Sequence, residues 1–146
     1  MAAAPTFTRS DPTASLFYLN TMAKMPELVD DGYHPKDEQT QDGIDSPVWH
    51  LVGDSSSIQE QGGTVVVAYQ DSTVLMLRLA MRGADGKWTK QYVAGHAMPF
   101  MGSYGFYANL KVNNGQGVLS SYAINQQMSN PSFYVEVLAV NLGIIQ

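Results

Sequence analysis

The chain contains three histidines, and histidine is the side chain that most often ligates metals or moves protons near neutral pH. They are His34, His50 and His96, and no two of them have the HxH or HxxxH spacing of a metal-ligand pair. There is no cysteine, which excludes disulfides, thiolate metal sites and cysteine nucleophiles. We therefore expect surface or loop positions for the histidines, and no metal or cofactor site.

Six acidic residues between positions 30 and 46 form a second candidate group. Calcium takes oxygen ligands at short alternating spacing, but the spacing here does not fit an EF-hand loop. The segment has Gly, Pro and no apolar periodicity, which favours a solvent-exposed acidic loop. These residues are Asp30, Asp31, Asp37, Glu38, Asp42 and Asp45.

Aromatic and methionine side chains gather in the segment HAMPFMGSYGFY, residues 96–107. Aromatic rings stack on sugar faces in many lectins, and soft Met-rich surfaces often mark protein contacts. The segment predicts either a ligand-binding surface or packing at a junction between sheets or subunits. The candidate ligand-binding residues are Phe100, Tyr104, Phe106 and Tyr107.

Composition narrows the classes of partner. The 146 residues suit one domain, and only 14% are charged, against about 25% in a typical globular chain. A net charge of −5 argues against nucleic-acid binding, which needs clustered Lys and Arg. The longest apolar run is far too short for a membrane span. The N-terminus is not a signal peptide as written. We expect an extracellular or cell-surface location, for which an exporting segment lies elsewhere or has been removed.

Short strands dominate the expected secondary structure. Residues 15–25 fit either a short amphipathic helix or a strand, and the two alternatives stay open. The segment PVWHLVG, residues 47–53, is a further strand candidate, and Asp-Gly within ADGK, residues 84–87, predicts a hairpin. The other strands are expected at 55–61, 64–71, 74–82, 88–95, 106–113, 118–125 and 132–142.

These strands form a repeat. GGTVVVAY aligns with GQGVLSSY, which matches Tyr69 with Tyr122, and Leu79-Ala80 aligns with Leu138-Ala139. The unit has four antiparallel strands and the size of a propeller blade. The second unit has three strands, and the chain ends before a fourth.

The stretch GGTVVVAYQDST…LRLAMRGADGKWTKQYVAG resembles the repeats of bacterial sialidase-like β-propellers, in a partial match over residues 47–142. The turn ADGKW resembles a degenerate Asp-box hairpin. The resemblance implies structural roles for Asp85, Gly86 and Trp88. A sialidase-like enzyme would also need an arginine cluster, whereas arginine occurs here only at Arg9, Arg78 and Arg82, so we expect no enzyme activity.

The sequence thus predicts an all-β protein with about two four-stranded antiparallel propeller-type blades over residues 47–142. Residues 1–46 are expected to be an irregular N-terminal extension and acidic linker, and a β-sandwich is the alternative fold. A propeller needs about four to eight blades. We therefore expect a non-catalytic structural or interaction subunit that is completed by other protein chains, with a lectin-like glycan-binding module using residues 96–107 as the alternative.

Overall fold

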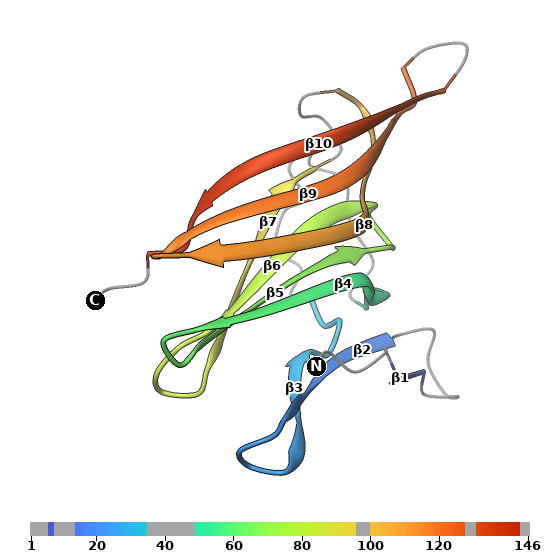
Figure 1. Cartoon of the computed structure of the whole chain (residues 1–146). Helices are drawn as coiled ribbons and strands as arrows, with labels where there is room; N and C mark the ends of the chain where they lie inside the picture. Colours follow the sequence, from blue (N-terminus) through green and yellow to red (C-terminus); the bar gives the residue numbers. More distant parts are fainter. Residues whose placement is uncertain (1–5, 8–13, 35–48, 96–99, 128–130, 144–146) are drawn as a thin grey trace.

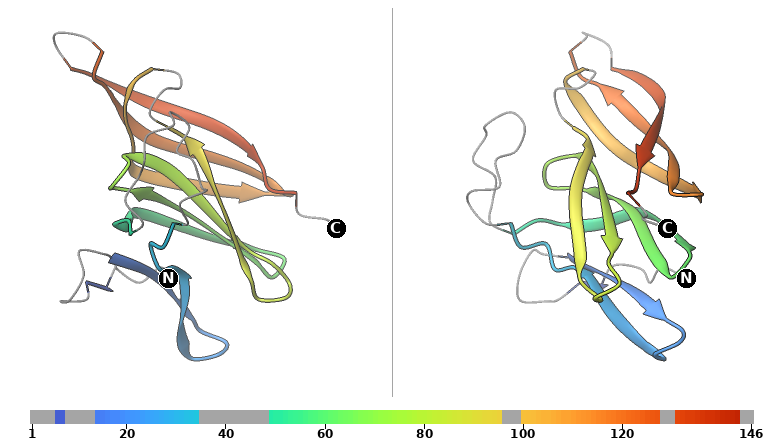
Figure 2. Two further views of the ribbon diagram at one scale, coloured as in Figure 1. Left: turned by 180° about the vertical axis from the view of Figure 1, so that it is seen from behind. Right: turned by 90° about the vertical axis from the view of Figure 1, so that its left-hand side faces the viewer.

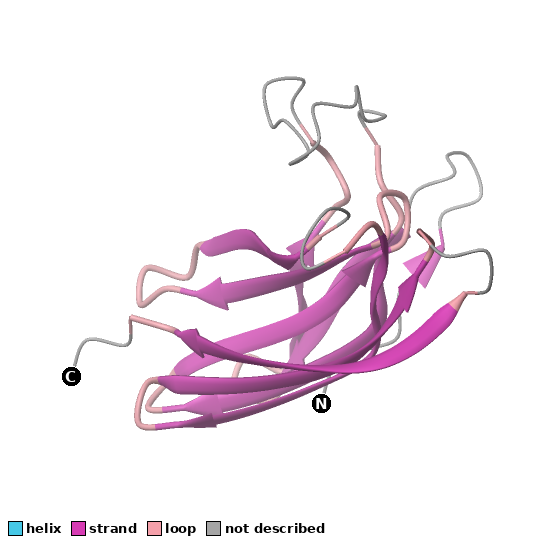
Figure 3. Ribbon diagram, turned by 90° about the horizontal axis from the view of Figure 1, so that it is seen from above, coloured by secondary structure: helices cyan, strands magenta, loops and turns pink. Residues whose placement is uncertain are grey.

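The computed structural model describes residues 6–7, 14–34, 49–95, 100–127 and 131–143, and all regular structure among them is antiparallel β-strand (Figure 3). The all-β prediction is confirmed. No helix among the described residues could span a membrane. The strands are β1 Thr6–Phe7, β2 Ala14–Asn20, β3 Met25–Asp30, β4 Val52–Gln61, β5 Thr64–Asp71, β6 Met76–Arg82, β7 Trp88–Ala94, β8 Gly102–Asn113, β9 Gln116–Asn125 and β10 Ser132–Asn141.

The strands form three sheets that lie one above another (Figure 1). Their orders are β1-β2-β3, β4-β5-β6-β7 and β10-β9-β8, so each sheet is a simple up-and-down meander. None of them closes on itself. We call the face of a sheet that points toward the preceding sheet in the chain its N-side face, and the opposite face its C-side face; in the first sheet, the C-side face is the one that packs on the second sheet.

The N-terminal extension was expected to be irregular, and the structure corrects this prediction. Strands β2 and β3 pair from Leu16↔Asp30 to Asn20↔Met25, which also settles residues 15–20 as strand rather than helix. The side chain of Asn20 accepts hydrogen bonds from the backbone N–H groups of Met22 and Ala23, so it stabilises the hairpin turn. Asp30 therefore ends a strand instead of opening an acidic loop.

Apolar side chains fill both spaces between the sheets. Leu16, Tyr18 and Val29 of the first sheet pack on the N-side face of the second, against Val67 and Tyr69 among others. On its C-side face, the second sheet packs against the third. The residues of that larger core include Val66, Ala68, Leu77 and Leu79 from the second sheet and Leu110, Leu119 and Ala123 from the third.

The second and third sheets are close together along their first strands. The hydroxyl of Ser57 in β4 accepts a hydrogen bond of 3.0 Å from the backbone N–H of Leu110 in β8. At the opposite side, β7 and the end of β10 stand apart around an open pocket, so the two sheets diverge from β4/β8 toward β7/β10 (Figure 2).

The strand pairing revises the repeat alignment by one residue. Thr64 follows the β4–β5 turn and Gln116 follows the β8–β9 turn, so the equivalent of Tyr69 is Ser121 and not Tyr122. Because Tyr69 pairs with Arg78 and Ser121 pairs with Glu136, Arg78 and Glu136 are also equivalent. A one-residue slip moves every side chain to the other face of a sheet, which is why the Tyr and Leu-Ala matches had joined residues on opposite faces.

Candidate functional site

The most distinctive surface is the C-side face of the third sheet, which we call the outer face. Val118, Val135 and Val137 on it are 51%, 63% and 65% exposed. Their partners across the strands place further side chains on the same face, because residues directly opposite one another share a face. By register, the outer face includes Asn109, Lys111, Val118, Ser120, Tyr122, Ile124, Phe133, Val135, Val137 and Ala139, and Tyr107 joins it through its ring contact with Tyr122.

The equivalent positions of the second sheet show what such a face normally does. Val66, Leu77 and Leu79 correspond to Val118, Val135 and Val137, and all three are at most 2% exposed. They are buried because the third sheet covers them. The outer face therefore has the apolar pattern of a covered sheet face, and nothing in the described part of the chain covers it.

The structure separates the four aromatic residues that were predicted to bind a ligand. Tyr104 is fully buried in the core, and its hydroxyl is bonded to the backbone O and N–H of Phe100. Phe100 is half-buried, with its ring stacked on Tyr104 at 5.3 Å, and Phe106 is also half-buried. Only Tyr107 is well exposed, at 76%. Residues 102–107 are strand rather than loop, and 96–99, with His96, lie outside the described residues.

The ADGKW turn joins β6 to β7 and contacts the first sheet. Asp85 Oδ1 accepts a hydrogen bond of 3.0 Å from the Lys87 N–H, and Gly86 has a φ of +81°, which favours glycine. Trp88 packs edge-on against Tyr18, with ring centroids 5.6 Å apart, and donates its indole N–H to Glu27. The turn is thereby attached to the β2–β3 hairpin.

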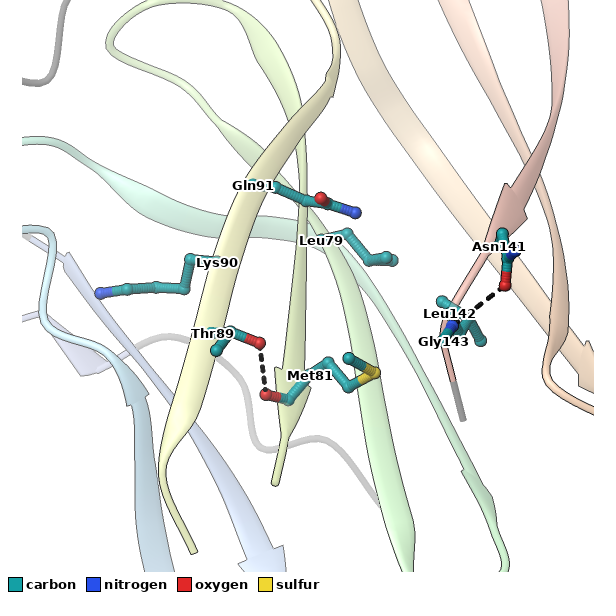
Figure 4. Close-up of a pocket in the computed structure, with 8 residues that line it drawn as sticks. All are labelled: Leu79, Met81, Thr89, Lys90, Gln91, Asn141, Leu142 and Gly143. Atoms are coloured by element: carbon teal, nitrogen blue, oxygen red, sulfur yellow. Dashed lines mark hydrogen bonds between the residues drawn. The ribbon is translucent and has the colours of Figure 1, made fainter. Parts of the chain in front are cut away.

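The pocket between the diverging edges offers little chemistry. It has a volume of about 190 Å³, and Figure 4 shows Leu79, Met81 and Gln91 on one side and the end of β10 on the other. Lys90 points away from it, toward the first sheet, where its ammonium lies 3.2 Å from Asp30. The Asn141 side chain accepts a hydrogen bond from the backbone N–H of Gly143, so this polar group of the pocket already has a partner.

A second cluster, buried and polar, lies on the N-side face of the second sheet. Arg78 Nη1 is 3.1 Å from Asp30 Oδ2, and Tyr69 donates a hydrogen bond of 2.6 Å to the same oxygen. Burial alone would raise the pKa of Asp30, but the charges of Arg78 and Lys90, with hydrogen bonds from Tyr69 and Gly32 N–H, outweigh it and hold that pKa below its usual value. Asp30 is thus a buried, fully paired carboxylate.

The two described histidines belong to this cluster, and the expectation of surface positions for them is wrong. They lie outside the strands, but His34 and His50 are only 4% and 1% exposed, and their rings stack at 3.8 Å. Asp71 Oδ2 lies 2.5 Å from His50 Nδ1 and accepts a hydrogen bond of 2.9 Å from Tyr92. The sequence spacing did not show this, because residues 34 and 50 are brought together by the antiparallel bridge between Tyr33 and Trp49.

Two histidines and a carboxylate with ligand atoms within 4.8 Å of one another are a conceivable metal-binding set. However, Arg78 Nη1 lies 2.5 Å from His34 Nε2, the nitrogen that faces Asp71. A divalent cation would compete with the guanidinium for His34, and with His50 and Tyr92 for Asp71. The arrangement is better suited to joining the first two sheets through paired buried charges than to holding an ion.

Arg78 and Arg82 lie on the same face, as their even spacing indicated, and each pairs with an acidic residue of β3. Arg78 pairs with Asp30, and Arg82 Nε lies 2.5 Å from Glu27. With this geometry established, comparison with protein-family models, curated proteins and solved structures finds no match to the chain. The site must therefore be interpreted from its own physical chemistry.

Replacing Arg78 by Met would leave Asp30 buried with fewer partners. We expect a loss of about 3 kcal/mol in the free energy of unfolding, measured by urea titration, because breaking a buried ion pair leaves an uncompensated charge. The exposed pair Lys87–Asp85 provides the control, and Lys87→Met should change stability little. The double variant Asp30→Asn/Arg78→Met should lose less than the sum of the two single variants; strict additivity would contradict the coupling.

The depressed pKa of Asp30 also predicts a pH dependence. Its contribution to stability is complete above the unfolded-state pKa of about 4 and is lost as the pH falls through the lower native value. The variant Asp30→Asn should therefore lose stability less steeply with acidification below about pH 4. Urea titrations of both proteins between pH 2 and pH 7 measure this, and parallel curves would show that Asp30 does not titrate abnormally.

Proposed function

We propose that this protein is a non-catalytic structural or interaction subunit that buries the outer face against a sheet of another chain. The single observation that carries the proposal is the contrast between equivalent apolar positions. Leu77 and Leu79 are at most 2% exposed beneath the third sheet, whereas Val135 and Val137 are more than 60% exposed. A contiguous apolar face of this kind marks an interaction surface.

The finer form of the proposal is that the covered assembly is a β-propeller or a similar stack of blades. Three observations support it: consecutive sheets repeat the same meander, the second and third sheets converge at β4 and β8, and they diverge toward β7 and β10. Moreover, β10 corresponds to β6, which has β7 beside it, whereas β10 is an edge of its sheet among the described strands. An exposed edge strand favours pairing with another chain.

A glycan-binding module remains the second candidate, and one observation favours it. Tyr107 lies edge-on against Tyr122 at a centroid distance of 5.9 Å, and both rings are exposed on the outer face. A sugar could stack on this pair. Retention on a glycan array that disappears in Tyr107→Ala, but persists in Phe133→Ala, would favour this alternative over a sheet–sheet interface.

Assembly through the outer face can be tested by changing a single valine. Val137→Glu places a charge within the buried area, so the association that wild type shows at micromolar concentration should weaken at least about 100-fold, as a buried unpaired charge requires. Light scattering and native mass spectrometry measure the mass. In samples dilute enough for wild type to be dissociated, the thermal unfolding curve should stay unchanged, because Val137 is exposed within one chain. Lys87→Glu is the control. A wild-type chain that remains a stable monomer at these concentrations would contradict the proposal.

A further inference from the structure

The geometry points to a specific occupant of the outer face: the β2–β3 hairpin of a second copy of this chain, bound head to tail. The inference rests on the proposed function and adds the identity of the partner surface. Its starting point is that the described residues leave two apolar sheet faces uncovered, one at each end of the stack.

The second uncovered face is the N-side face of the first sheet. Strand pairing places Phe17 opposite Leu28 and Leu19 opposite Pro26, so these four apolar residues share one side of the hairpin. Leu19 and Leu28 are 42% and 43% exposed there. The acidic residues of β3 do not interrupt this face, because Glu27 and Asp30 point to the opposite side, toward Arg82 and Arg78.

The two interfaces inside the chain stack the sheets in sequence order, with the first and third sheets on opposite faces of the second. In both, the C-side face of one sheet packs on the N-side face of the next. The outer face is a C-side face, and the uncovered face of the hairpin is an N-side face. Docking one on the other repeats, between two copies, the relation that already joins successive sheets within one copy.

Charge also favours this pairing over contact between two outer faces. Among the described residues of the outer face, Lys111 has the only charged side chain, and an interface between two outer faces would contain it twice. The described residues of the hairpin's exposed face carry no charge. A contact between different surfaces also leaves one free face at each end, so it either closes into a ring or continues to grow.

The decisive experiment uses two blocked variants. Val137→Glu blocks the outer face and Leu28→Glu blocks the hairpin, and each still has the surface that the other lacks. Each variant alone should be monomeric, with association weakened at least about 100-fold relative to wild type. An equimolar mixture, with one variant isotopically labelled, should give a 1:1 heterodimer in native mass spectrometry and nothing larger. The milder pair Val135→Ser and Leu19→Ser replaces them if thermal unfolding shows that a Glu variant does not fold.

The outcomes separate the inference from the proposed function. If wild type associates and Val137→Glu does not, but Leu28→Glu associates as wild type does, the occupant is not the hairpin and only the further inference fails. Absence of a heterodimer in the mixture overturns the inference in the same way. A monomeric wild type overturns both, whereas monomeric variants that restore each other's association support the head-to-tail contact.

Discussion

Every apolar face of a sheet must be covered, and this constraint explains most of the molecule. The second sheet satisfies it on both sides, with the first sheet against Val67 and Tyr69 and the third against Val66 and Leu79. Within the described part of the chain, the first and third sheets each have one apolar face covered. Burial of apolar surface contributes roughly 25 cal/mol per Å², so the free energy still available to the chain resides in the two end faces of the stack.

The two interfaces between sheets are stabilised by different interactions, although equivalent residue pairs lie at them. Tyr69 and Arg78 form a cross-strand pair that reaches Asp30 in the preceding sheet, which makes this interface sensitive to charge. The equivalent pair in the third sheet is Ser121 and Glu136, for which neither Ser121 Oγ nor Glu136 Oε2 has a hydrogen-bond partner in the described residues. Burial raises the pKa of Glu136 above its usual value. The first interface is thus fixed by ion pairs and the second mainly by apolar packing.

The sequence predicted the strands well, since local signals decide them: Gly62-Gly63, Asp85-Gly86 and Gly115 mark turns between alternating apolar segments. It predicted the faces poorly, because a shared Tyr or Leu-Ala pair says nothing about register, and one residue of slip exchanges the two sides. Arg78 within an otherwise apolar strand was the available signal for the buried cluster, because a buried guanidinium needs an acidic partner. His34 and His50 gave no such signal, since their stacking depends on how the first sheet packs against the second.

The buried cluster and the outer face are connected through the stack. The ion pairs of Asp30 and Glu27 hold the β2–β3 hairpin on the second sheet and turn its polar side chains inward. As a consequence, the opposite side of the hairpin contains Phe17, Leu19 and Leu28 without intervening charge. Without these inward pairs, the acidic side chains of β3 would have to find solvent, and the hairpin could not keep its apolar side exposed in one orientation. The polar network is therefore best understood as the element that presents an apolar surface, rather than as a site of chemistry in its own right.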